Sequence, residues 1–546
     1  MSVPQSEPVE PARSDSDGDG VWAKVAALED LRRRKSLVVK VGGKQIALFS
    51  TEKGIYACNN RCPHEGYPLR EGTLSHGCVL TCNWHNWKFD LESGETLVGG
   101  DPLRRYPVQV RGDEVWIDVA DPPAAARQEA ALASLRGSFP RMEYDRMARE
   151  ITRFAAAGGV PLEALARAVE WTHDHIEYGM SHAAAAAPDW VDLGRTLARD
   201  EAEVLTSVVE PVAHLAWDSL RERRYPFPEG KAAYDPVALV RAIDAEDEPT
   251  AVGLLRGALE SGLGFAELEG PLAEAALRHY ADFGHSAIYV VKTGALIERL
   301  GPGVAEPLLL ALVRSLVYAW REDLVPEFRT YARAVETWRG EPAPTDAPAP
   351  TPGGFRGLSA KQAMAKCLDH RAEPRGLYDA LFGAAAWNLL HFDRGVEQRT
   401  DNQVDDNVGW LSFTHAITFA NAARTLAERH PDLWAPALLQ MACFVGRNNA
   451  YVDGKQDVSS WRVAEPEAFF KASGRALFDH GQFDYLVAAH LVKTWTAAHQ
   501  EWEAAPDAPW NDDLHAALNR FMHTPLKRKH VLRTARQSRR FVKLEG

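Results

Sequence analysis

The sequence predicts a multidomain protein in which a small all-β domain precedes a large all-α region. Residues 21–119 contain short runs of alternating polar and apolar residues separated by Gly and Asp. Residues 37–41, Gly42-Gly43 and residues 45–49 are one example, and this pattern is typical of a β-hairpin. After Asp121-Pro122-Pro123, Ala, Leu, Glu and Arg dominate, and apolar residues recur at helical spacing to the end of the chain. The length of 546 residues fits two or three domains.

Composition divides the chain further. Residues 1–20 are rich in Ser, Pro, Asp and Glu and lack the apolar segment of a signal peptide, so we expect a disordered leader. The sequence EPAPTDAPAPTPGG begins at Glu341 and predicts a linker between two helical halves. The expected segments are the leader (1–20), the β domain (21–120), a first helical half (121–340), the linker (341–357), a second helical half (358–524) and a basic tail (525–546).

The two helical halves show signs of a duplication. Gly284-His285 opens one expected long helix and Thr414-His415 opens another, and Pro307 and Pro436 follow them at nearly the same distance.

Bulk properties exclude several classes of protein. Subtracting 75 acidic from 62 basic residues gives a net charge of −13, which argues against general nucleic-acid binding. No apolar run is long enough to cross a bilayer, and six cysteines do not indicate a disulfide framework. A cytoplasmic protein without a membrane partner is therefore expected.

The pair Cys62-Pro63-His64 and Cys82-Asn83-Trp84-His85 is the most informative motif of the chain. Two thiolates and two imidazoles can hold a structural zinc ion, or they can hold an iron–sulfur cluster with the thiolates on one iron and the imidazoles on the other. The residues around the motif distinguish these alternatives. Residues 55–66, Pro68-Leu69, Trp87-Lys88-Phe89 and Ser93-Gly94 flank the four donors, with strand-like segments on either side.

In this context, residues 21–120 resemble the Rieske [2Fe–2S] domain family. The resemblance implies a small antiparallel β-sandwich with a [2Fe–2S] cluster on Cys62, His64, Cys82 and His85, and a role in one-electron transfer. Tyr67 and Trp84 stand where respiratory-complex members carry a disulfide, which favours the ferredoxin and oxygenase branch.

The second loop departs from the family pattern. Asn83 and Asn86 replace the usual Pro and Gly, so we expect a different backbone course there.

The fused helical region is expected to receive the electrons. The sequence contains no dinucleotide-binding Gly motif after a strand, so NAD(P)H chemistry is assigned to an external reductase. A ring-hydroxylating oxygenase domain is not predicted, because its D-x-x-H-x-x-x-x-H iron motif is missing and the region is helical. Electron exchange between neighbouring subunits occurs in those oxygenases, which makes a homo-oligomer an open alternative.

Histidines cluster in the helical part. His175 and His182 lie seven residues apart on one helical face, and Asp282 and His285 share a face with Tyr289. Most histidines on Ala-rich helices are ordinary core or surface residues, and that interpretation stays open. Histidines beside carboxylates, in a chain that carries an electron donor, favour a non-haem iron site within a helical bundle. The candidate catalytic residues are His175, His182, Asp282 and His285, and the candidate iron ligands are His175, His182 and His285.

Two short stretches also resemble the questin-oxidase-like family. They are residues 283–289 and 306–312, and residues 173–182 are loosely similar to that family's early histidine cluster. The resemblance implies oxygen insertion into an aromatic or polyketide substrate, with His175, His182 and His285 at the site and His415 as a counterpart in the second half. His490 and His499 are further histidines of the last expected helices.

The sequence therefore predicts a Rieske-fused oxidoreductase. Electrons from an external NAD(P)H-dependent reductase would reach a non-haem iron that uses O₂ to oxidise a small organic molecule. A Rieske ferredoxin or redox sensor fused to a helical binding scaffold, with no second metal, is the alternative. A helical domain with a non-covalent haem is a third.

Overall fold

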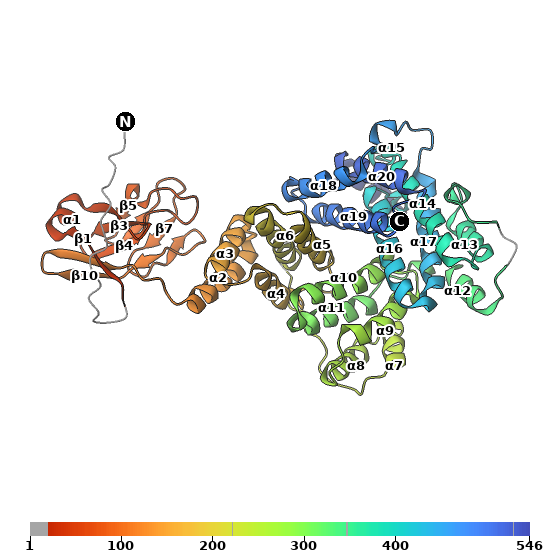
Figure 1. The fold of residues 1–546 in the computed structure, drawn as a ribbon, viewed down its shortest axis with the longest axis horizontal. Helices are drawn as coiled ribbons and strands as arrows, with labels where there is room; N and C mark the ends of the chain where they lie inside the picture. Colours follow the sequence, from red (N-terminus) through yellow and green to blue (C-terminus); the bar gives the residue numbers. More distant parts are fainter. Residues whose placement is uncertain (1–19, 221, 345–347, 528, 546) are drawn as a thin grey trace. The chain divides into compact units, whose positions relative to one another are not determined.

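The alternating segments near the N-terminus form strands, and nearly everything after residue 123 forms helices, as Figure 1 shows for this computed structural model. The structure describes residues 20–220, 222–344, 348–527 and 529–545. The chain divides into two units between Pro161 and Leu162. The predicted class, a small β domain followed by a large helical region, is confirmed. Residues 1–19 of the expected leader and 345–347 of the expected linker lie outside the described residues.

Three antiparallel sheets build the first part of the first unit. Their strand orders are β1-β11-β10, β2-β3-β4-β9 and β5-β6-β7-β8, and the short helix α1 connects β1 to β2. The elements are β1 (Trp22–Ala27), α1 (Leu28–Arg34), β2 (Ser36–Val41), β3 (Lys44–Ser50), β4 (Ile55–Asn59), β5 (Thr73–Ser75), β6 (Val79–Thr81), β7 (Lys88–Asp90), β8 (Thr96–Val98), β9 (Arg105–Tyr106), β10 (Val108–Arg111) and β11 (Glu114–Asp118).

Strand β3 has a hydrophobic core on each face. Because successive side chains of a strand point to opposite faces, Ile46 and Leu48 enter one core while Ala47 and Phe49 enter the other. The first core is shared with β1, β2 and β11, and the second lies against β6 and β7. Cys62 and Cys82 belong to the second core, so the loops that carry them rest on a packed base.

Two helices beyond the predicted end of the β domain at residue 120 also belong to the first unit. They are α2 (Ala124–Ser138) and α3 (Tyr144–Ala156), which pack against each other. The carboxylate of Asp101, which is fully buried, accepts hydrogen bonds from Arg149 at 3.0 and 2.7 Å and from Arg153 at 2.7 Å. These ion pairs attach α3 to the loop between β8 and β9.

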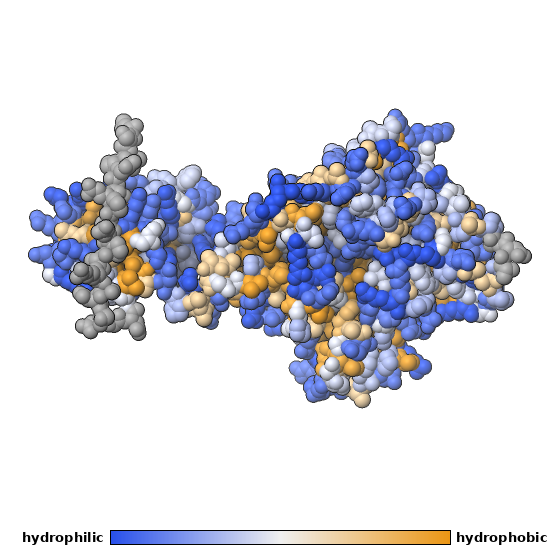
Figure 2. Space-filling model, viewed as in Figure 1, coloured by the Kyte–Doolittle hydropathy of each residue, from blue (hydrophilic) through white to orange (hydrophobic). Residues whose placement is uncertain are grey.

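Helices make up the second unit, and it has no described strands. They are α4 (Pro161–Thr172, beginning at the last residue of the first unit), α5 (His182–Leu197), α6 (Glu201–Ser219), α7 (Pro236–Asp244), α8 (Glu248–Glu260), α9 (Phe265–Arg278), α10 (His285–Leu300), α11 (Ala305–Val317), α12 (Tyr331–Gly340), α13 (Ala360–Asp369), α14 (Pro374–Leu390), α15 (Arg394–Gln398), α16 (Trp410–Arg429), α17 (Trp434–Asn448), α18 (Pro466–Ala476), α19 (Tyr485–Ala504), α20 (Asn511–His523) and α21 (Val531–Leu544). None of the described helices combines the length and the apolar character needed to cross a bilayer. The face of this unit seen in Figure 2 is mostly hydrophilic, with apolar residues gathered in several places.

Four of these helices form a closed ring. Helix α5 packs against α10, α10 against α16, α16 against α19, and α19 against α5. Each of the four therefore has two neighbours within the ring, and side chains near one end of it can meet at a common point.

The two expected halves share a local pattern. Helix α10 is followed by the 3-10 helix η4 (Pro302–Val304) and α11, and α16 is followed by the 3-10 helix η8 (Pro431–Leu433) and α17. His285 opens α10, whereas His415 lies in the second turn of α16, so the two histidines do not occupy equivalent helix positions.

The expected basic tail contains α21. Its Arg533 is buried and donates hydrogen bonds to the carbonyl oxygens of Val396, Glu397 and Arg399, so this helix lies on the helical unit.

We predict that Asp101→Ala lowers the free energy of unfolding of the first unit by about 3 kcal/mol, because two arginines lose a buried partner. Native-state hydrogen exchange of the α3 amides measures the change. Burial alone would raise the pKa of Asp101, but Arg149 and Arg153 outweigh it and hold the pKa below its ordinary value. The contribution is therefore fully present above about pH 4 and is lost as the pH falls through the folded-state pKa.

Asp121→Ala is the matched control. Asp121 also pairs with two cations, Lys44 and Arg104, but its side chain is 45% exposed, so the expected loss is below about 1 kcal/mol. Equal losses in the two variants would show that Asp101 does not anchor α3.

Candidate functional site

Two loops with the same backbone pattern carry the Cys and His motifs. The Cys62 N–H donates to the Tyr67 carbonyl at 2.9 Å, and the Cys62 carbonyl accepts from the Gly66 N–H at 2.9 Å. Cys82 repeats this pattern with Trp87 at 2.8 Å and Asn86 at 3.0 Å. The expected departure of the second loop from the family's backbone course, at Asn83 and Asn86, stays a prediction, because these bonds compare only the two loops of this chain with each other. Asn86 adopts a left-handed φ of 61°, close to the 75° of Gly66, and Asn tolerates that conformation.

The four side chains of these loops converge with the sulfurs inside and the imidazoles outside. Cys62 and Cys82 are buried, whereas the side chains of His64 and His85 are 25% and 38% exposed. The two thiols are hydrogen-bonded neighbours, and burial, helped by Cys82, raises the pKa of Cys62 to about 11. The two imidazole rings meet edge to face at 4.8 Å. This donor set fits a cluster with one iron on the sulfur side and one on the nitrogen side.

Aromatic rings fix both imidazoles. Trp87 stacks on His64 with ring centroids 4.6 Å apart, and Trp84 stacks on His85 at 5.0 Å. Glu65 places one carboxylate oxygen 3.7 Å from His64 and the other 3.9 Å from His85. The imidazole edges are thus held in place and remain within reach of a partner.

A second cluster, which we call the four-histidine cluster, consists of His182, His285, His415 and His490. Each comes from a different helix of the closed ring: α5, α10, α16 and α19. Neighbouring Nε2 atoms lie 3.1 Å apart for His182 and His285, 2.9 Å for His285 and His415, and 3.4 Å for His415 and His490. The rings of His490 and His182 close the circle, with centroids 4.8 Å apart.

Backbone carbonyls fix the tautomers of three of these rings. The Nδ1 atoms of His285, His415 and His490 lie 2.5, 2.5 and 2.7 Å from the carbonyl oxygens of Asp282, Leu411 and Leu486. A carbonyl oxygen only accepts, so each Nδ1 carries the hydrogen and each neutral ring turns the lone pair of Nε2 inward. Lone pairs that face one another repel unless a cation lies between them, and metal-binding histidines are oriented in this way.

The spacing of the Nε2 atoms matches one metal ion. Metal–nitrogen bonds of about 2.0–2.1 Å at angles between about 90° and 109° place neighbouring nitrogens about 2.9–3.4 Å apart. The observed separations of 2.9, 3.1 and 3.4 Å lie in this range. The cluster can therefore hold a single ion with imidazole ligands, a donor type that suits Zn, Cu, Fe and Ni.

The surroundings keep the imidazoles neutral. Burial, followed by the charge of Lys493, lowers the pKa of His285 to about 3 and the pKa of His182 well below its ordinary value. Burial, followed by the neighbouring His285 and His490, lowers the pKa of His415 well below its ordinary value. Neutral imidazole is the form that binds metals. Lys493 is itself fully buried, its Nζ lacks a hydrogen-bond partner among the described residues, and burial lowers its pKa to about 7.

A left-handed turn precedes His285. Asp282, Phe283 and Gly284, which form the 3-10 helix η3 (Asp282–Gly284), have φ values of 48°, 53° and 76°. Two consecutive non-glycine residues in this region are uncommon, and such strain persists only where the surroundings impose it. A Cβ atom on Gly284 would lie 2.7 Å from Phe419 and 3.0 Å from Phe444, so this position requires glycine for space as well as for conformation.

Ionisable groups lie next to the turn. Burial raises the pKa of Asp282 to about 7, and one carboxylate oxygen of Asp282 lies 4.0 Å from Nδ1 of His285. Burial also raises the pKa of Glu322 to about 7, with the nearby Asp282 adding to the effect. The buried ring of Tyr289 lies 5.4 Å from that of His285. Two carboxyl groups beside the cluster can thus exchange protons near neutral pH.

The structure brings together some of the sequence-predicted residues and separates others. His182, Asp282 and His285 meet at the four-histidine cluster. His175 instead has its Nδ1 3.3 Å from the carbonyl oxygen of Glu222 and its Nε2 3.8 Å from Asp174. His415 and His490, which the sequence analysis noted without making them candidate ligands, complete the cluster. Spacing along the sequence could not identify them, because His415 contacts His285, 130 positions away, and His490 contacts His415, 75 positions away.

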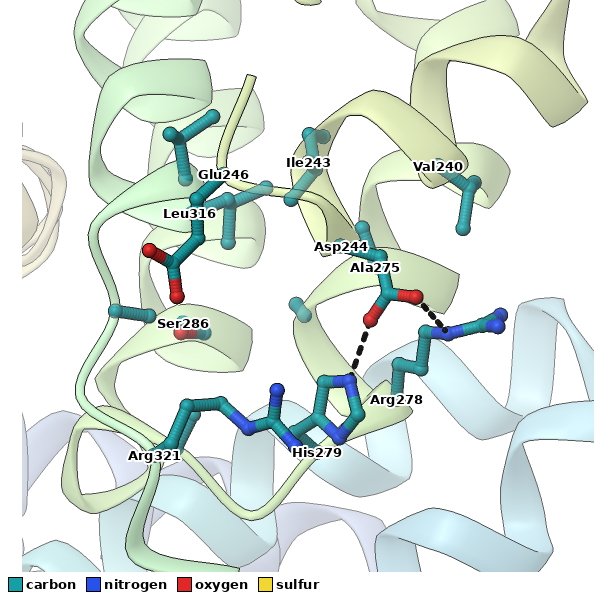
Figure 3. Close-up of a pocket in the computed structure, with 14 residues that line it drawn as sticks. Val240, Ile243, Asp244, Glu246, Ala275, Arg278, His279, Ser286, Leu316 and Arg321 are labelled. Atoms are coloured by element: carbon teal, nitrogen blue, oxygen red, sulfur yellow. Dashed lines mark hydrogen bonds and ion pairs between the residues drawn. The ribbon is translucent and has the colours of Figure 1, made fainter. Parts of the chain in front are cut away.

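Figure 3 shows a small cleft of about 30 Å³ near the start of α10. His279 lies in it with Nε2 2.5 Å from Asp244, and Arg278 pairs with the same carboxylate at 3.3 Å. Ser286, the residue after His285, also lines the cleft. Asp244, Arg278, His279 and Arg321 of the cleft are already paired, which indicates a structural role.

Comparisons with known proteins concern a small part of the chain. The model of the family described as Rieske [2Fe-2S] domain matches residues 21–106. The ferredoxin component of the naphthalene 1,2-dioxygenase system of Pseudomonas aeruginosa is 33% identical over 101 residues, which are 18% of this chain and 96% of that protein. The 4beta-methylsterol monooxygenase of Methylococcus capsulatus is 33% identical over 116 residues, 19% of this chain, and the match spans only 31% of that protein.

Among solved structures, the ferredoxin of carbazole 1,9a-dioxygenase from Nocardioides aromaticivorans IC177 matches at 26% identity and a TM-score of 0.17, over 18% of this chain and 96% of its own. Each of these matches covers less than a fifth of this chain.

We predict that Gly284→Ala destabilises the helical unit by about 3 kcal/mol or more, because the new Cβ combines a left-handed φ with a clash against Phe419 and Phe444. Thermal unfolding of the full chain measures the loss. Gly301→Ala, with a φ of 89° and open space around it, isolates the backbone strain and should cost about 1 kcal/mol. Gly303→Ala has open space and serves as a neutral reference. If Gly284→Ala behaved like Gly303→Ala, the turn would not be closely packed.

Proposed function

This chain belongs to the Rieske [2Fe–2S] domain family through residues 21–106, and from this premise we propose that it passes electrons to a non-haem iron held by the four-histidine cluster. The Rieske domain implies a [2Fe–2S] cluster. We assign Cys62 and Cys82 as ligands of one iron and His64 and His85 as ligands of the other, because their side chains converge from two loops of matching backbone. Imidazole ligands raise the potential of such a cluster above that of an all-cysteine ferredoxin.

The observation that carries the second metal site is the inward direction of the Nε2 lone pairs at metal-like spacing. Three carbonyl oxygens set the tautomers of His285, His415 and His490. Burial lowers the pKa of His285 and of His415, so no proton is available to separate the facing lone pairs in place of a metal ion. The proposed ligands are therefore His182, His285, His415 and His490. His175 is not included, since its ring contacts Glu222 and Asp174.

Iron at this site would supply the one-electron chemistry that lets O₂ react with an organic substrate. The chain's own residues fix the conditions for that reaction. The helix carbonyls orient the imidazoles, and the ring of α5, α10, α16 and α19 limits the access of water. Asp282 has a pKa near 7, so its carboxyl group can hold or release a proton next to His285 at neutral pH.

The electron donor in this proposal is an external NAD(P)H-dependent reductase. All strand pairs of the described residues are antiparallel, whereas a dinucleotide-binding fold needs a parallel βαβ arrangement. The exposed imidazole edges of His64 and His85 are suited to electron exchange with a docked protein.

The substrate is proposed to be a small aromatic or polyketide-like molecule. The similarity to a dioxygenase ferredoxin component and to a monooxygenase supports an oxygenase system. The aromatic rings of Phe283 and Tyr289, 5.7 Å from His415 and 5.4 Å from His285, support a site for an aromatic compound.

We predict two acid-labile sulfides and three irons per chain in anaerobically purified protein, with the EPR signal of a Rieske cluster after reduction by dithionite. His415→Ala should lower the iron content to two and leave the sulfide and the EPR signal unchanged, because one ligand of the second site is lost. His175→Ala, at a histidine outside the four-histidine cluster, is the matched control and should retain three irons.

Other outcomes identify other functions. Two irons in the parent chain, with no iron lost on His415→Ala, would favour the ferredoxin or redox sensor on a helical scaffold. A strong Soret band would indicate haem. Zinc without sulfide would contradict the Rieske cluster itself.

A further inference from the structure

The left-handed turn of residues 282–284 supplies the carbonyl oxygen that orients His285. That oxygen belongs to Asp282 and lies 2.5 Å from Nδ1 of His285. Asp282 and Phe283 adopt φ values of 48° and 53°, which are unfavourable for non-glycine residues. The turn therefore needs contacts from outside itself to keep this shape, and with it the direction of the His285 ring.

One neighbouring segment, residues 320–323, supplies these contacts. The Asp282 N–H donates to the carbonyl oxygen of Trp320 at 2.7 Å, and the Asp323 N–H donates to that of Tyr280 at 2.9 Å. The Phe283 N–H donates to a carboxylate oxygen of Glu322 at 3.1 Å. Each of the two non-glycine residues of the turn is thus hydrogen-bonded through its own backbone nitrogen.

An ionic network around the buried carboxylate of Asp323 fixes that segment in turn. The Nδ1 atom of His279 lies 3.0 Å from Asp323, and Arg321 donates two hydrogen bonds to the same carboxylate at 2.8 and 3.0 Å. The other nitrogen of His279 faces Asp244 at the end of α7, as Figure 3 shows. The ring of His279 therefore bridges two carboxylates. The network joins α7, the end of α9 and the segment before α12 at the point where α10 begins.

We propose that Asp244, His279, Arg321, Glu322 and Asp323 are positioning residues of the four-histidine cluster. They hold the left-handed turn so that the Asp282 carbonyl fixes the ring of His285. Glu322 is the direct contact, and the other four residues keep its segment in place. This inference rests on the proposed function, because it assigns these residues to the metal site named there.

Glu322 allows a sharp test, because one substitution removes the hydrogen-bond acceptor and another retains it. In Glu322→Ala the Phe283 N–H loses its partner, whereas in Glu322→Gln the side-chain oxygen can still accept from it. The control Glu248→Ala removes a carboxylate that pairs with Arg314 on α11 and with Tyr318, the residue after that helix, both outside the turn and its network. The probe is Co(II), added to full-length protein from which the second metal has been removed. The cluster is kept oxidised, so that it is diamagnetic and the EPR spectrum reports cobalt.

We expect Glu322→Ala to weaken Co(II) binding about 10- to 100-fold and to broaden its EPR spectrum, as is typical when an outer-shell partner is lost. Glu322→Gln should stay within about threefold of the parent affinity, and Glu248→Ala should keep the parent spectrum even if it lowers the unfolding temperature. An equal loss in the Ala and Gln variants of Glu322 would overturn the proposal, because the charge rather than the acceptor would then matter. Parent-like binding in Glu322→Ala would also overturn it.

Hydrogen exchange separates this inference from the proposed function. On the metal-free protein, the Phe283 amide should exchange faster in Glu322→Ala than in the parent chain, and at the parent rate in Glu322→Gln. The proposed function would be overturned if the parent chain bound no Co(II), or if the His415→Ala variant bound as much Co(II) as the parent chain. The exchange rate of Phe283 would still decide whether Glu322 holds the turn, and an unchanged rate in Glu322→Ala would refute that role.

Discussion

Hydrogen bonds from imidazole Nδ1 atoms to backbone carbonyls set the chemistry of the helical unit. Each carbonyl fixes one tautomer, and each fixed tautomer directs a lone pair towards the same point. Low dielectric surroundings then make protonation costly, so the rings stay neutral and repel one another unless a cation separates them. The packing of α5, α10, α16 and α19 around one another brings the four imidazoles together despite this repulsion. Facing lone pairs are thus a locally unfavourable arrangement, which the surrounding hydrophobic packing stabilises.

The two centres of the chain use different building principles. The Rieske loops repeat one short backbone motif, so a continuous stretch of 24 residues, from Cys62 to His85, contains every cluster donor. Sulfurs lie on a packed core and imidazoles face outward, which suits an electron carrier that meets partners. The four-histidine cluster takes one residue from each of four helices and encloses them. Enclosure suits a centre that must control which small molecules and protons reach it.

These differences explain what the sequence could predict. The proposed donors Cys62, His64, Cys82 and His85 could be identified as candidates from the sequence, because they lie within two short loops whose spacing is fixed by local backbone geometry. Residue type alone does not indicate that Asn86 adopts, in the second loop, the left-handed conformation that Gly66 has in the first. In the helical unit, helical spacing places His175 on one face with His182, but the chain leaves α4 and turns before α5 begins. His415 and His490 join the cluster only through tertiary packing of helices distant in sequence. The alternation of the β region and the helical spacing of the rest were strong enough to predict the fold class.

The sequence positions of the donors also determine which of the two groups of side chains is completed first during synthesis of the chain. The first unit ends at Pro161. The contacts between Asp101 and α3 can therefore form once the chain has been synthesised past Pro161. The four-histidine cluster needs His490, which follows 329 residues later (490 − 161). At about 5–20 residues per second, synthesis separates the two events by about 15–65 s. The loops of Cys62 and Cys82 are therefore complete while the helical ring still lacks α19, and the N-terminal unit can meet iron and sulfide before the four histidines come together.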